Sequence, residues 1–231
     1  MKHFRHWQIL LLFFSSNLLV AQAPIRFYEH GKCGFKKADG TILVPAQYDA
    51  GSEFNEGFAI VMAGGKMGFM NEAGAVIIPF QFDEASLFVN GLAKVRKKGK
   101  YGYINYTGTY VISADYDQAE DFCEGLALVN QKGLFGFIDP SGKIVVPFQY
   151  TEAHSFSEKL AAVQLNGKWG FIDKNGKTII PFDYDMAYFF HKGESPVRKG
   201  NIEFYINAGN KFIREVEKHE EKEGGGEQKK Q

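Results

Sequence analysis

Residues 160–184 read LAAVQLNGKWGFIDKNGKTIIPFDY and contain the signals for three short β-strands. Leu160–Val163 and Trp169–Asp173 are rich in strand-forming residues and are separated by Asn166-Gly167, a dipeptide typical of tight hairpin turns. A second Asn-Gly pair precedes Thr178–Ile180, and the proline that follows is expected to end pairing because it has no N–H group to donate. The stretch therefore predicts a three-stranded β-meander, about the smallest sheet that is stable.

The same pattern recurs along the chain at one constant spacing, the step from Gly34 to Gly68. Each unit has a glycine followed by an aromatic residue, and these framework pairs are Gly34-Phe35, Gly68-Phe69, Gly102-Tyr103, Gly136-Phe137 and Gly170-Phe171, the last preceded by Trp169. Tetratricopeptide repeats have a period of the same length, but they are pairs of helices. Most units here carry several glycines and a Val-Pro or Ile-Pro pair, and inside a helix glycine costs about 1 kcal/mol and proline about 3 kcal/mol. The period therefore indicates a tandem array of β-units.

Two recurring positions indicate which face of the first strand is buried. Alanine and valine recur two residues apart, as in Ala127 and Val129, so their side chains share one face of the strand. The position between them accepts Lys94 in one unit and is expected to lie near water. The aromatic residues at the positions of Tyr48 and Phe54 are expected to cover the seams between units, since stacked repeats bury their faces only against their neighbours.

These patterns predict an all-β protein: a tandem array of about five 34-residue, three-stranded β-meander repeats. A solenoid-like stack is preferred to a propeller-like closure, because propeller blades usually have four strands in about 40–45 residues. The array is assigned to residues 22–213, with a half unit at its start and a decayed unit at its end, where Phe204 replaces the glycine. The charged segment 214–231 is predicted to be a flexible tail.

The first 21 residues have the layout of a secretory signal peptide. A short basic start is followed by the apolar run Ile9–Val20 and by small residues. The run is shorter than the roughly 20 residues of a membrane span. We expect cleavage after Ala21, because Pro24 would hinder a cut after Ala23. The protein is thus predicted to be exported to the periplasm, the outer cell envelope or the extracellular space.

Composition limits the classes of partner. The chain has 27 Lys and Arg against 27 Asp and Glu, whereas a nucleic-acid-binding protein needs a basic surface for the phosphates. No segment after the predicted signal peptide is apolar enough to span a membrane. Neither a nucleic acid nor a membrane span is therefore expected for the mature chain.

No set of residues predicts a catalytic, metal or cofactor site. Gly176-Lys177-Thr178 is similar to the end of a phosphate-binding loop, but the earlier glycine of that motif is missing. The histidines have no metal-ligand spacing, and His154-Ser155 lacks the strand–turn–helix context of a nucleophile. Cys33 and Cys123 lie more than two units apart, so no disulfide is expected between them. The sequence therefore predicts no enzyme.

Acidic residues recur after the framework aromatics. The aspartates at Asp49, Asp83, Asp117 and Asp185 are interpreted as turn or cap residues, because they recur in most units. The glutamates at Glu56, Glu124 and Glu158 are interpreted as exposed acids of the connecting loops.

Residues 167–177, with the sequence GKWGFIDKNGK, resemble the WG (or KWG) repeat of bacterial proteins. Ile180-Pro181, Tyr184-Asp185 and Ala187 are similar to the same consensus, and the resemblance covers about residues 25–213. Trp169 supplies the only tryptophan of the motif, since Cys33, Met67, Tyr101 and Phe135 hold that place elsewhere. The resemblance implies a β-rich repeat array, often exported, and it implies no common activity.

The function predicted from these observations is a non-catalytic binding scaffold at the bacterial cell envelope, with a protein, peptide or glycan as its partner. A purely structural spacer and an enzyme with an unrecognised site in the connectors are the alternatives. A partner is expected to contact the connectors, which vary most between units and recur at one point of each unit. They are residues 49–56, 83–90, 117–124, 151–158 and 185–192, with Phe88, His154, Tyr188 and His191 as candidate contacts.

Overall fold

The computed structural model describes residues 22–216, which form strands and turns only. The strands are β1 (Ile25–Glu29), β2 (Lys32–Lys36), β3 (Ile42–Tyr48), β4 (Ala50–Gly51), β5 (Phe58–Ala63), β6 (Lys66–Asn71), β7 (Val76–Phe82), β8 (Glu84–Ala85), β9 (Ala93–Lys97), β10 (Lys100–Ile104), β11 (Tyr110–Tyr116), β12 (Gln118–Ala119), β13 (Ala127–Gln131), β14 (Leu134–Ile138), β15 (Ile144–Tyr150), β16 (Glu152–Ala153), β17 (Ala161–Leu165), β18 (Lys168–Ile172), β19 (Thr178–Tyr184), β20 (Met186–Ala187), β21 (Glu194–Lys199), β22 (Ile202–Asn207) and β23 (Phe212–Glu215). The prediction of an all-β repeat array is confirmed.

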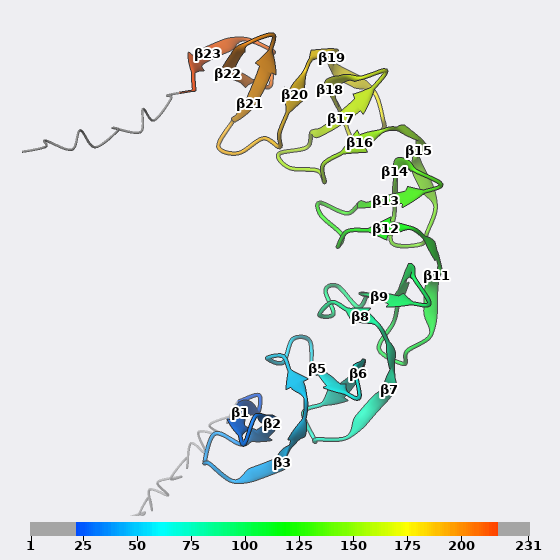
Figure 1. The fold of residues 1–231 in the computed structure, drawn as a ribbon, viewed down its shortest axis with the longest axis vertical. Coiled ribbons are helices and arrows are strands. Elements are labelled where there is room, and N and C mark those ends of the chain that lie inside the picture. Colours follow the sequence, from blue (N-terminus) through cyan, green and yellow to red (C-terminus); the bar gives the residue numbers. More distant parts are fainter. Residues whose placement is uncertain (1–21, 217–231) are drawn as a thin grey trace, which may run out of the picture.

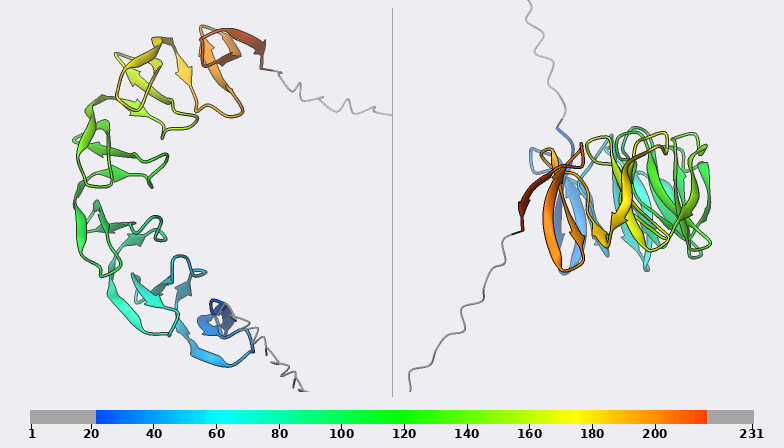
Figure 2. Two further views of the ribbon diagram at one scale, coloured as in Figure 1. Left: turned by 180° about the vertical axis from the view of Figure 1, so that it is seen from behind. Right: turned by 90° about the horizontal axis from the view of Figure 1, so that it is seen from above.

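The strands form six antiparallel sheets, which we call blades one to six in chain order. Blade one contains β1–β3, and each later blade contains four strands, such as β12-β13-β14-β15 in blade four. The blades lie side by side around an open arc (Figures 1 and 2). The open array agrees with the preferred prediction, and the propeller-like closure is not seen among the described residues.

Blades two to six contain the three predicted strands and a fourth strand that was not predicted. The fourth strand is only two residues long and lies within the predicted connector, as Gln118–Ala119 does in blade four. It pairs with the next strand through Gln118↔Asn130 and Ala119↔Val129. A two-residue strand has no alternation that a sequence pattern could reveal.

The core lies in the seams, the interfaces between consecutive blades. Ala127 and Val129 of blade four are fully buried, as predicted, and they pack with Tyr103 and Ile112 of blade three. The opposite face is also covered in places: Leu128 and Ala162 are buried, although this position was expected to lie near water. Each inner blade is packed between two others, so both of its faces contact protein.

The recurrent glycine is needed for close packing of two strands. A Cβ atom at Gly170 would lie 2.7 Å from the carbonyl oxygen of Ile180 in β19. The register between β18 and β19 shifts at this point, which is characteristic of a β-bulge. Pro181 lies within β19 and does not end it, contrary to the prediction, because an outer edge strand with a bulge tolerates the missing N–H group.

Polar side chains also join consecutive blades. Asp49 accepts a hydrogen bond from Lys32 of blade one (2.6 Å) and another from the backbone amide of Gly64 in blade two (2.8 Å). The equivalent ion pairs are Lys66–Asp83, Lys100–Asp117 and Lys168–Asp185. The turn role predicted for these aspartates is thus seen, together with a link across the seam.

The connector glutamates are exposed, as predicted, and they also accept hydrogen bonds from the following blade. Glu56 accepts hydrogen bonds from the amides of Asn90 (2.8 Å) and Gly91 (3.1 Å) in the next blade. Glu158 accepts one from the amide of Gly193 (2.8 Å) in the same way, and Glu124 accepts one from the amide of Lys159 (3.1 Å).

The two ends of the arc differ from its middle. Strand β23 extends to Glu215, so the first two residues of the predicted tail belong to blade six. The predicted signal peptide, residues 1–21, and residues 217–231 lie outside the described residues. Within residues 22–216, no helix long and apolar enough to cross a membrane is found.

A candidate binding site at the end of the arc

The connectors extend toward the concave side of the arc, as the loops from β12 to β13, β16 to β17 and β20 to β21 show in Figure 1. Each tip is a two-residue turn with positive φ angles, for example Glu124 (51°) and Gly125 (89°). The isolated bridge Cys123↔Leu126 closes this hairpin. The expected single edge of connectors therefore exists, and the curvature of the array makes it the inner edge.

Phe88 is withdrawn as a candidate contact because its side chain is 0% exposed. It packs against Phe69 in the seam between blades two and three, with 4.9 Å between ring centroids. The phenylalanine of the connector is therefore a structural residue of the seam and not a surface residue.

The structure brings two of the predicted contacts, His154 and Tyr188, together. They occupy the same position in consecutive repeats, and their rings stack with 6.0 Å between centroids and 21° between planes. His154 also stacks on Trp169, with 5.3 Å between ring centroids and 20° between planes. Burial in this stack lowers the pKa of His154, despite a hydrogen bond with the backbone of Ala187 that acts in the opposite direction. Trp169, His154 and Tyr188 therefore form one stack that crosses the seam between blades five and six.

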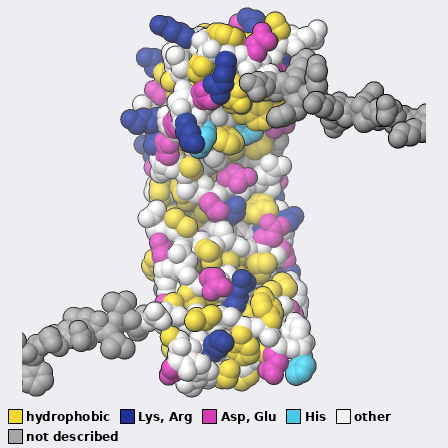
Figure 3. Space-filling model, turned by 90° about the vertical axis from the view of Figure 1, so that its left-hand side faces the viewer, with side chains coloured by type: hydrophobic (Ala, Val, Ile, Leu, Met, Phe, Trp, Pro, Cys, Tyr) yellow, Lys and Arg dark blue, Asp and Glu magenta, His cyan; other side chains and the backbone are white. Residues whose placement is uncertain are grey.

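Tyr188 also lines a hollow of about 380 Å³ together with His191, the fourth predicted contact. Phe189, Glu194, Pro196 and Tyr205 complete the lining, and all six residues belong to blade six or its connector. Tyr188 and Phe189 are 43% and 53% exposed. Figure 3, which faces the concave side, shows histidine side chains among hydrophobic and basic ones over the end of the arc where blades five and six lie.

One wall of the hollow is held by an ion pair. Both guanidinium nitrogens of Arg214 lie 2.5 Å from the carboxylate oxygens of Glu194. Arg214 also lies over the ring of Tyr205, 4.1 Å from its centroid. Hydrogen bonds from Arg214 hold the pKa of Glu194 below its usual value, so the carboxylate is charged at neutral pH. The wall therefore has a fixed geometry and little net charge.

The sequence analysis missed Phe189, Glu194, Pro196 and Tyr205. The available signal was departure from the repeat, since the equivalent positions of the preceding unit hold Ser155, Leu160, Ala162 and Phe171. Glu194 thus replaces a buried leucine, and Tyr205 replaces a buried phenylalanine. In the same way, an aromatic ring at the position of Tyr188 occurs only in the last two repeats, whereas Ser52, Ser86 and Glu120 stand there earlier.

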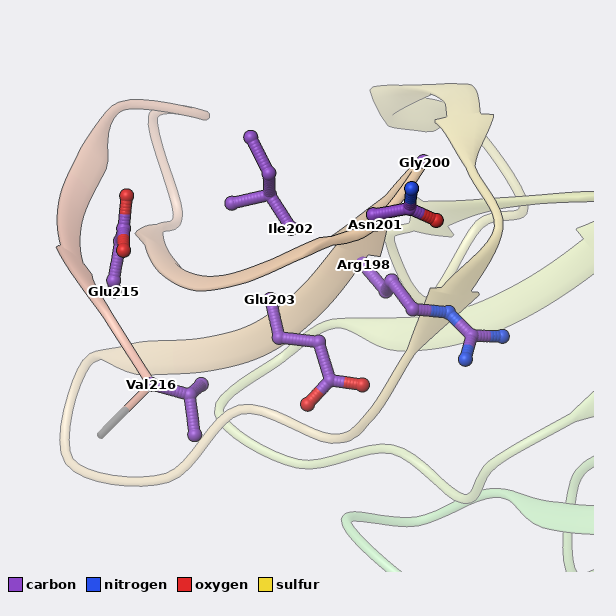
Figure 4. Close-up of a pocket in the computed structure, with 7 residues that line it drawn as sticks. All are labelled: Arg198, Gly200, Asn201, Ile202, Glu203, Glu215 and Val216. Carbon is purple, nitrogen blue, oxygen red and sulfur yellow. The ribbon is translucent and has the colours of Figure 1, made fainter. Parts of the chain in front are cut away.

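A larger hollow of about 440 Å³ lies beside the β21–β22 hairpin and the end of β23 (Figure 4). Its lining includes Arg198, Glu203 and Val216. Val216 is the last residue that the structure describes, so the outer limit of this hollow is not defined. We therefore assign no site to it.

The other candidates for chemistry in residues 22–216 are metal-ligand clusters and the two cysteines. No group of three or more His, Cys, Asp or Glu side chains suited to a metal ion occurs within residues 22–216. Cys33 is buried in the first seam, and the thiol of Cys123 lies 3.0 Å from the carbonyl oxygen of Phe156 in the next blade.

Comparison with known proteins agrees with the repeat. Residues 34–66, 67–101, 101–135, 135–169 and 169–201 match the family described as WG containing repeat. No curated protein matches the sequence.

Solved structures show likeness of fold only. The crystal structure of a eukaryotic initiation factor is 12% identical, with a TM-score of 0.56 over 84% of this chain and 62% of that one. Hsv2 of Kluyvelomyces marxianus is 11% identical, with a TM-score of 0.45 over 69% of this chain and 61% of the other. The extracellular domain of BT4673 from B. thetaiotaomicron is 12% identical, with a TM-score of 0.42 over 82% and 34%. The chain thus spans about three fifths or less of the length of these structures.

Proposed function

Because the chain belongs to the WG repeat family, whose units build an open arc with an inner edge of connectors, we propose that it is an exported binding scaffold. Its ligand site is the hollow between Tyr188 and Tyr205, and the partner is a protein or peptide of the cell envelope. The observation that carries the proposal is the exposed aromatic lining of this hollow, formed where the last repeat departs from the others.

The residues at which the last repeat differs from the earlier repeats lie where a ligand could reach them. A repeat that served only to stack would need the same residues in each seam, as Ala127 and Val129 and their equivalents show. Phe189 and Tyr188 instead form exposed apolar surface that lines one hollow, and a contiguous exposed apolar patch is typical of an interaction site. The hollow also has the size of a typical ligand pocket.

Two other functions are weaker alternatives. A structural spacer would need no rings at the positions of His154 and Tyr188, where other repeats have small or acidic residues. An enzyme with its site in this hollow has less support, because the one carboxylate of the lining, Glu194, is engaged by both terminal nitrogens of Arg214. Binding without catalysis fits both observations.

A differential capture experiment tests the proposal. Immobilised mature protein and a Tyr188→Ala, Phe189→Ala variant are exposed to envelope extract, with Val111→Ala on the outer strand β11 as the matched control. Val111 has a similar exposure, 44%, but lies in blade three. We expect a partner that the unaltered protein and the control retain and the double variant loses. Identical capture by all three proteins would contradict a site at this hollow.

A further inference from the structure

Every internal seam contains the same aromatic contact, which shows what this surface of a blade accepts. The phenylalanine of each connector packs against the framework aromatic of the blade before it, with ring centroids 4.7–5.5 Å apart. The pairs are Phe35–Phe54, Phe69–Phe88, Tyr103–Phe122, Phe137–Phe156 and Phe171–Phe190. Each blade therefore offers a seat for a phenylalanine side chain.

The fifth seat shows which residues form it. Phe190 belongs to one buried cluster with Leu160, Ala162 and Phe171 of blade five. The side chain of Ser157 donates a hydrogen bond to the main-chain carbonyl of Phe190 (2.6 Å), as Asn55 does to that of Phe88 (2.6 Å). A seat thus binds both the ring and the carbonyl group of the phenylalanine that occupies it.

The hollow at the end of the arc is the sixth seat. Glu194, Pro196 and Tyr205 occupy the repeat positions of Leu160, Ala162 and Phe171, and His191 occupies that of Ser157. Blade six is the last blade in residues 22–216, and no described residue supplies a sixth phenylalanine. The seat is consequently open, and its lining is the lining of the hollow.

The charges around the sixth seat differ from those around the other five. In three connectors a glutamate accepts hydrogen bonds from amides of the following turn, as Glu158 does from Gly193. Lys192 occupies this position in the last connector and has no ion-pair partner among the described residues. An ammonium group cannot accept a hydrogen bond from an amide, and it attracts a carboxylate instead. The last repeat therefore favours an occupant that carries a carboxylate near this position.

A second copy of the chain is a poor occupant. In a head-to-tail pair, the seat would be filled by a connector that precedes the first blade. Among residues 22–216, blade one begins at β1 with no such connector before it.

We propose that the hollow binds the phenylalanine side chain of an acidic partner peptide. The phenylalanine ring packs on Tyr205 and Pro196, the His191 imidazole donates to the carbonyl oxygen of that phenylalanine, and Lys192 pairs with a carboxylate two residues later. This inference rests on the proposed binding function and names the chemistry of its ligand.

A synthetic peptide with the sequence of Asp49–Gly57, DAGSEFNEG, is the probe, because it has an acid two residues after its phenylalanine. Fluorescence polarisation of the labelled peptide measures its affinity for the mature protein. Replacing the phenylalanine by alanine should weaken binding at least about tenfold, since a buried phenylalanine side chain contributes at least that factor. Equal binding of the two peptides would overturn the proposal.

Two protein variants locate the contact. Pro196→Trp fills the hollow and should reduce peptide binding at least about tenfold, whereas Val111→Trp on β11 should leave it unchanged. Lys192→Glu should weaken the acidic peptide several-fold and should favour a peptide in which the second glutamate is lysine. Circular dichroism melting checks that each variant is folded. If Pro196→Trp is unfolded, the proposal is still tested by the affinity of Lys192→Glu for the two charged peptides and by the affinity of the unaltered protein for the alanine peptide.

The two proposals fail in different ways. If no peptide binds but envelope capture is lost on filling the hollow, the binding function stands and the phenylalanine ligand is wrong. If chitohexaose binds and Pro196→Trp abolishes that binding, the hollow is a glycan site and this inference is overturned. If capture is also unaffected by filling the hollow, both proposals fail.

Discussion

Lys32 and Asp49 form an ion pair across the first seam, with 2.6 Å between the ammonium nitrogen and a carboxylate oxygen. The pair recurs in three other seams, but Leu134 and Thr151 stand at the two positions between blades four and five. Lysine and aspartate are thus lost together, which indicates that each residue is useful only with its partner. Thr151 forms a hydrogen bond with Gln164 instead (2.7 Å).

Restoring the pair should stabilise the fourth seam. We expect Leu134→Lys with Thr151→Asp to raise the melting temperature by about 1–3 °C, the range of a partly exposed ion pair in a chain of this size. Each single substitution should have a smaller effect. A double-mutant cycle followed by thermal unfolding measures the coupling, and strictly additive effects would contradict the interpretation.

Lys159 should be replaceable by glycine with a gain in stability. Its φ angle is 71°, in the left-handed region, and Gly57, Gly91, Gly125 and Gly193 occupy this position in the other connectors. A side chain in this region costs about 1 kcal/mol relative to glycine. Urea unfolding of Lys159→Gly should show a gain of that order, whereas Lys143→Gly, at an exposed position without a positive φ, should show none.

The assignment of the buried strand face predicts a large difference between two valines. Val129→Asp places an unpaired carboxylate at a fully buried position and should destabilise the protein by at least about 3 kcal/mol. Val111→Asp, at a position 44% exposed, should cost about 1 kcal/mol or less. Similar losses in chemical denaturation would show that the seams do not bury this face.

Acid should destabilise the seam between blades five and six through His154. The folded protein lowers the pKa of His154 because stacking desolvates the ring, whereas the unfolded imidazole has a pKa of about 6.5. The unfolded chain therefore binds more protons as the pH falls through 6.5, and stability decreases until the folded pKa is reached. Melting temperatures at pH 7.5 and 5.5 should differ less in His154→Phe than in the unaltered protein. His191→Gln, at an exposed ring, is the control and should keep the full difference.

Export predicts a defined N-terminus. Mass spectrometry of the protein from the envelope or culture medium should give a chain that begins at Gln22. A cytoplasmic protein that retains residues 1–21 would exclude export.

The sequence was sufficient to predict the repeat array, but it was not sufficient to predict the short inner strands or the burial of Phe88. Strictly spaced glycines and aromatics such as Gly170 and Phe171 predicted the repeat, because each has an unavoidable packing role. The two-residue inner strands could not be predicted, since they are held by the neighbouring strand and by no local pattern. Phe88 was misassigned because a conspicuous aromatic residue in a loop looks the same in sequence whether a neighbouring blade covers it or not.

The candidate site was predicted in part. His154, Tyr188 and His191 do lie around the end of the concave edge, because the connectors that contain them recur at one point of each repeat. Tyr205 and Glu194 were missed because they replace buried framework residues, and such replacements become informative only when the end of the array is known.

A single residue separates each outer strand from the inner strand of the next blade, as Asp49 separates β3 from β4. No spare residues therefore connect consecutive blades. Tension applied to the two ends of the array acts directly on the hydrogen bonds between paired strands. The short inner strands hold only two residues each, so they would detach first and lengthen the array in discrete steps. Under a stretching force the arc would therefore lengthen in steps, as one inner strand after another detaches, and not smoothly as an elastic linker does.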